Sequence, residues 1–75
     1  MNVKELEVKL LTEGFDQKSY EFYLEYPNEA YTIHEGKIKW EVYYGERGCK
    51  SGLKKFKTED EACKYFYQLI NANII

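Results

Sequence analysis

Few side chains in this sequence are of the types that carry out catalysis, and none of them stands in a catalytic arrangement. The one histidine, His34, lies in a short alternating segment, and no glycine-rich elbow surrounds Ser19 or Ser51. Nucleophilic catalysis needs a serine or cysteine held beside a base, and the spacing of these residues does not predict that pairing. We therefore expect that the protein is not an enzyme and that His34 is an exposed imidazole near a turn.

The two cysteines do not predict a metal site. Cys49 and Cys63 show no CxxC spacing, and His34 has no neighbour at metal-ligand spacing. Cys63 lies on the apolar stripe of a predicted helix, where a free cysteine behaves as a small hydrophobic residue. A disulfide between the two cysteines is conceivable in space but disfavoured in a cytosolic setting. We expect no metal, no cofactor and two reduced thiols.

A basic segment runs from Lys50 to Lys57 around Phe56. Such a segment can touch RNA through phosphate contacts and base stacking, but lysines also protect an edge strand from pairing with other chains. Eleven lysines and arginines stand against thirteen acids, which gives a formal net charge of -2. This balance argues against nucleic acid as the main partner.

Side chains suited to protein binding gather at a predicted hairpin tip near residues 43–47. Tyr43, Glu46 and Arg47 are expected to be exposed there, since the strand's other face packs on the core. Tyrosine and arginine are the types that most often anchor protein interfaces. We predict these three residues as the partner-binding site, and a local role for Glu46 and Arg47 in the turn stays open.

The chain has 75 residues, which is enough for one small domain, residues 1–75. The elements that position these residues must belong to that domain. Aromatic residues make up 17% of the sequence, and their rings supply burial that a short chain otherwise lacks. The chain opens with no basic and apolar leader and has only short apolar runs. We expect a cytoplasmic protein without a membrane partner.

A helix is predicted at each end of the domain. Asn2 and Glu5 form a capping box, and apolar residues then recur at helical spacing until Gly14. Thr58 caps the second helix, and the acids over 59–61 lie in its first turn, next to the positive end of the helix dipole. We interpret these acids as a helix start and not as a catalytic carboxylate cluster.

Alternation predicts four strands between the helices. The first spans 20–26 and ends at Pro27 and Asn28, and the second is a short run at 31–34. Gly36 is expected to take a positive φ in a tight turn after the second strand. The third strand places on its core face, at every second position, Ile38, Trp40, Val42 and Tyr44.

The fourth strand spans 50–57, and its register stays open. Leu53 and Phe56 are three apart and cannot share a face without a bulge, which we place at Gly52. The order α-β-β-β-β-α predicts an α+β domain. Its two helices pack on one face of an antiparallel meander of three to four strands.

Two strings of residues resemble a known family. The first covers 40–48 and reads W-E-V-Y-Y-G-E-R-G, and the second covers 56–63 and reads F-K-T-E-D-E-A-C. Both resemble small immunity proteins that are encoded beside bacterial polymorphic toxins, and the likeness spans roughly residues 26 to 70. The resemblance implies an inhibitor that binds a toxin domain and blocks it, and we place this interface on Tyr43, Glu46 and Arg47.

Two other functions stay open. One is a small nucleic-acid-associated module that uses Lys54, Lys55 and Lys57 with Phe56. The other is a self-associating structural or accessory protein whose exposed strand pairs with a second copy. The sequence does not decide between a monomer and a homodimer.

Overall fold

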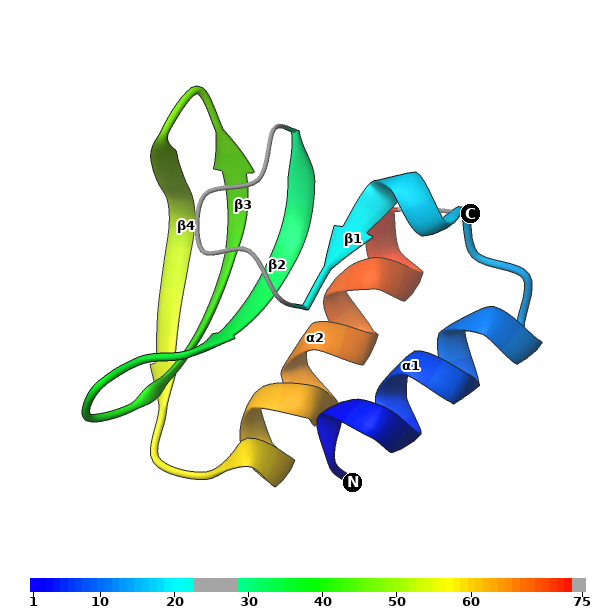
Figure 1. Cartoon of the computed structure of the whole chain (residues 1–75), viewed down its shortest axis with the longest axis horizontal. Helices are drawn as coiled ribbons and strands as arrows, with labels where there is room; N and C mark the ends of the chain where they lie inside the picture. The colour runs from blue at the N-terminus through cyan, green and yellow to red at the C-terminus, as the bar shows by residue number, and fades with distance from the viewer. Residues whose placement is uncertain (23–28, 74–75) are drawn as a thin grey trace.

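The structure is a computed structural model that describes residues 1–22 and 29–73. Its strands form one sheet in the order β1-β2-β3-β4, and both helices lie on one side of that sheet (Figure 1). The α+β class, with a helix first and last and a four-stranded sheet, is confirmed. In chain order the elements are α1 (Val3–Thr12), the 3₁₀ turn η1 (Gln17–Ser19), β1 (Tyr20–Glu21), β2 (Ala30–Glu35), β3 (Trp40–Glu46), β4 (Cys49–Phe56) and α2 (Glu59–Asn73).

The sheet is mixed, so the prediction of a fully antiparallel meander is wrong. β3 runs antiparallel to both β2 and β4, but β1 runs parallel to β2, with Tyr20 opposite Tyr31. Of the strand predicted over 20–26, β1 comprises two residues, Tyr20–Glu21, and Phe22 follows as a bend. Residues 23–26 and the predicted end at Pro27 and Asn28 lie outside the described residues. Alternation indicates an extended segment, but it carries no information on the direction of the partner strand.

Both helices begin as their caps predict. The Asn2 side chain accepts a hydrogen bond from the Glu5 backbone N–H, and the Glu5 carboxylate accepts one from the Asn2 N–H. At α2, the Thr58 hydroxyl accepts a hydrogen bond from the Glu61 N–H at 3.2 Å. Each cap satisfies backbone donors that the first helical turn leaves without partners.

The acids at the start of α2 also hold α1 in place. The Glu59 carboxylate accepts a hydrogen bond from the Val3 N–H at 2.7 Å, and Asp60 pairs with the amino group of Met1 at 2.6 Å. The hydrogen bond from that amino group, followed by the one from Lys64, lowers the pKa of Asp60. The acids therefore have a structural role, as we interpreted them from the sequence.

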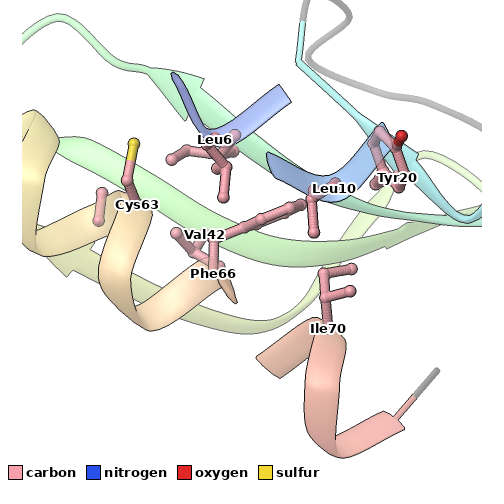
Figure 2. Packing of buried hydrophobic residues seen from close by; sticks show 9 residues of the cluster. Leu6, Leu10, Tyr20, Val42, Cys63, Phe66 and Ile70 are labelled. Atoms are coloured by element: carbon pink, nitrogen blue, oxygen red, sulfur yellow. The ribbon is translucent and has the colours of Figure 1, made fainter. Parts of the chain in front are cut away.

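The core lies between the helices and the sheet. α2 packs against β2, β3 and β4, and α1 packs against α2. Phe66 of α2 is fully buried, with its ring 5.8 Å from that of Phe22. Burial also raises the pKa of the Cys63 thiol to about 11, so Cys63 acts as a small apolar residue. The cluster comprises Leu6, Leu10, Tyr20, Ile33, Val42, Ala62, Cys63, Phe66 and Ile70 (Figure 2).

Two glycines fix the geometry of the sheet in different ways. Gly52 has a φ of 65°, and the β3–β4 register shifts between Val42 and Tyr44, which confirms the predicted bulge. Gly36 is not among the residues with positive φ, so that prediction is wrong. A Cβ at Gly36 would lie 2.7 Å from the carbonyl oxygen of Lys39, so a close backbone approach requires the glycine there.

Candidate protein-binding surface

The β3–β4 hairpin ends in a two-residue turn that carries two of the predicted site residues. Glu46 pairs with Cys49, and Arg47 and Gly48 form the turn with φ values of 49° and 76°. Positive φ at both central residues is typical of a type I′ turn, which suits the twist of a hairpin. Glu46 and Arg47 are exposed at this tip, as expected, while their role in binding stays a prediction.

Arg47 is an unusual residue for its backbone position. Glycine, asparagine and aspartate occupy the left-handed region most readily; for other residues the clash of Cβ with the backbone carbonyl costs about 1–2 kcal/mol there. The turn itself therefore gives no reason for an arginine. Packing gives none either, since the side chain is exposed.

Tyr43 does not belong to the exposed surface, so that expectation is wrong. Its side chain is 1% exposed, and its register partner Thr32 is fully buried. Both residues lie on the sheet face opposite α2, because their neighbours Ile33 and Val42 belong to the core cluster. The ammonium of Lys50 lies 5.0 Å from the centre of the Tyr43 ring, within range of a cation–π contact.

Lys50 extends across Tyr43 to reach Glu41. The Lys50 Nζ and the Glu41 Oε1 are 2.8 Å apart, and the two side chains are only 17% and 16% exposed. Carboxylate, ammonium and ring therefore form one compact polar group on a sheet face that we expected to be open. A lysine that bridges a ring and a carboxylate loses solvent but gains two favourable electrostatic contacts.

Tyr44 lies near the hairpin tip, and its side chain is on the helix-covered face of the sheet. Its ring packs edge-on against Tyr31, with the ring centres 4.9 Å apart. Burial raises the pKa of the Tyr44 phenol, and the carboxylates of Glu29 and Glu46 raise it further. The phenol therefore stays protonated, so it is a neutral group beside the charged tip.

β4 forms one edge of the sheet and exposes most of its side chains. Six of its eight residues are exposed along the run from Cys49 to Phe56. An edge strand offers backbone N–H and C=O groups along its outer side to any strand that pairs with it. β4 and the tip form one continuous exposed surface, which we call the hairpin surface (residues 46–56).

A hollow of about 560 Å³ lies at the other end of β3 and was not predicted from the sequence. It is lined by the connection 36–39 and by His34, Glu35, Glu41 and Lys55. Ile38, which we predicted to face the core, is 91% exposed in this connection. A signal was present in the sequence, since Ile38 stands between two lysines just after a glycine.

Within the described residues, no group of three or more histidine, cysteine, aspartate or glutamate side chains is placed to hold a metal ion. Cys49 is exposed, Cys63 is buried, and both are free thiols. Among residues 1–22 and 29–73, no helix has the length and apolar character needed to cross a membrane.

No family model, curated protein or solved structure matches the chain.

Proposed function

We propose that this protein binds another protein through the hairpin surface and blocks it, as do the immunity proteins that its motifs resemble. The observation that carries the proposal is the exposure of β4 along the sheet edge, continuous with an exposed tip. Eight residues of extended chain span about 26 Å, which matches the scale of a standard protein interface. A preformed edge of this length binds by occlusion and needs no catalytic group.

Arg47 supports the tip as part of this interface. Its guanidinium is exposed beside Glu46, and its backbone adopts a conformation that the side chain disfavours. A residue that occupies a backbone conformation unfavourable for its side chain motivates a functional hypothesis. Arginine also suits an interface, because its planar fork makes paired hydrogen bonds to a carboxylate.

The two other functions open from the sequence have less support. A nucleic-acid module needs a free ring for stacking, but the Phe56 ring packs 5.2 Å from that of Tyr65. Self-association along β4 brings lysines together, because the strand carries Lys50, Lys54 and Lys55 and no acid. Like charges opposite one another destabilise a strand pair, so a different chain is the better partner.

The test is co-expression of the protein with the product of the neighbouring gene, followed by a pull-down. Arg47→Gly removes the side chain and relieves the left-handed strain, so the hairpin stays folded in this variant. We combine it with Glu46→Gln and expect at least about tenfold weaker binding, as for the loss of an interface anchor. Lys64→Gln on α2 is the control and should leave binding unchanged.

If the variant with both tip substitutions binds as tightly as the unmodified protein, the tip is not part of the interface. If no complex forms, and cells are not protected from the neighbouring product, the proposed function is wrong.

A further inference from the structure

The hollow at the 36–39 connection has a defined arrangement of charged side chains. His34 lies opposite Glu41, and Glu41 lies opposite Lys55, so the three residues form a row across β2, β3 and β4. The row lies on the sheet face opposite α2, because Ile33 and Val42 on the other face belong to the core cluster. Residues of the 36–39 connection line the hollow together with this row.

The charges around this hollow do not balance. Glu41 is already paired with Lys50 at 2.8 Å. Among the described residues, Lys37, Lys39 and Lys55 make no ion pair. Glu35 is the one other acid among the described residues of the lining, and these residues therefore carry a surplus of positive charge. Such a surplus favours an anionic occupant.

Ile38 indicates what else the occupant provides. Its side chain is 91% exposed between two lysines, and it is the most exposed of the large apolar residues that the structure describes. Burial of this side chain against a partner removes apolar surface from water without any change in the core. Among the described residues, the lining holds no phenylalanine, tyrosine or tryptophan and His34 is its one ring, so apolar contact of Ile38 with a protein fits better than base stacking.

We infer that the hollow receives an acidic segment of a protein partner, with Ile38 packed against apolar side chains of the same segment. This inference rests on the proposed function and adds the chemistry of the partner to it. Lys55 belongs to β4, so the hollow continues the hairpin surface, and one partner can contact both.

The test uses the full chain, labelled with ¹⁵N, and a short capped peptide of alternating glutamate and leucine. Amide resonances of residues 34–41 and 55 should shift and saturate, and added salt should weaken the binding. A peptide with lysine in place of glutamate should cause no shift. A peptide with serine in place of leucine should bind several-fold more weakly, because it lacks the contact with Ile38.

Matched charge variants locate the effect. The triple variant K37Q/K39Q/K55Q should bind the glutamate-leucine peptide about tenfold more weakly, since three exposed charge contacts are lost. The triple variant K4Q/K18Q/K64Q changes the net charge equally on α1, η1 and α2 and should bind like the unmodified protein. All six lysines are at the surface, and unchanged spectra elsewhere check the fold.

Three results would overturn the inference. The peptide could shift no resonance of the hollow, inorganic phosphate could give the same shifts at the same concentration, or a single-stranded oligonucleotide could bind there more tightly. The second result would mean a simple anion site, and the third a nucleic-acid site. The peptide test does not involve the neighbouring gene product, so a failure here leaves the proposed function to be judged by the pull-down.

Discussion

The two faces of the sheet achieve burial by different chemistry. The face beneath α2 contributes Ile33 and Val42 to an apolar cluster in which most side chains are fully buried. The opposite face also buries side chains, but there Lys50 joins Glu41 to the ring of Tyr43. Apolar contacts are non-directional, whereas the polar group depends on the position of each partner. The comparison assigns most of the stability to the first face, while our inference places the acidic partner segment on the second.

The largest effect should follow from loss of volume on the helix-covered face. Phe66→Ala removes a fully buried ring from the centre of the cluster and should lower the free energy of unfolding by about 3–5 kcal/mol. A chain of 75 residues is stabilised by only about 4–11 kcal/mol in total, so much of the variant should be unfolded. Urea denaturation followed by circular dichroism measures the change.

Ile38→Ala is the matched control for this substitution, because its side chain is 91% exposed. It should change the free energy of unfolding by no more than about 0.5 kcal/mol. A loss for Phe66→Ala below about 1 kcal/mol would contradict the assignment of stability to this face.

A smaller effect should follow from breaking the polar group on the opposite face. Glu41→Gln removes the carboxylate that lies 2.8 Å from the largely buried ammonium of Lys50 and should destabilise the protein by about 1–2 kcal/mol. Lys50→Met should cost a similar amount for the complementary reason. The double variant should lose less than the sum of the single variants, because this ion pair is lost only once.

Urea denaturation of the four proteins completes this double-mutant cycle. Strict additivity would mean that the ion pair contributes nothing, and the two faces would then differ less than we argue.

Local chemistry made part of this fold predictable. The capping box at Asn2 and Glu5 and the bulge at Gly52 depend on residues close in sequence, and both predictions are confirmed. The parallel pairing of β1 was not predictable, because it depends on where a later strand lies and not on the pattern of β1 itself.

The candidate site was predictable only where exposure follows from a turn. Glu46 and Arg47 are exposed because the hairpin reverses beside them. Tyr43 is buried, and one of the groups over its ring is the ammonium of Lys50 from a neighbouring strand, which alternation within one strand cannot report. Ile38 continues the apolar alternation of β3, so we predicted it on the core face of that strand. The strand begins only at Trp40, and the exposure of Ile38 and the hollow beside it were therefore not predicted.

The smallest effect should be a gain in stability from removal of a polar atom on the helix-covered face. Tyr20 belongs to the apolar cluster, and its buried hydroxyl has no hydrogen-bond partner among the described residues. Tyr20→Phe removes this group without loss of ring volume and should raise the free energy of unfolding by about 1 kcal/mol. Removal of a polar group would then raise the free energy of unfolding on the helix-covered face and lower it on the opposite face.

The pH dependence gives this last substitution a second measure. Burial, followed by the charges of Glu7 and Asp16, raises the pKa of the Tyr20 phenol above its ordinary value of 10.0. The folded state therefore keeps this proton at a pH where the unfolded chain loses it. The stability linked to Tyr20 is complete below the unfolded pKa and falls as the pH rises above it. Urea titrations at neutral and alkaline pH should show that Tyr20→Phe gains more over the unmodified protein at high pH. A gain that shrinks with pH, or a loss at neutral pH, would mean that the hydroxyl has a partner and that this face, too, is held by polar contacts.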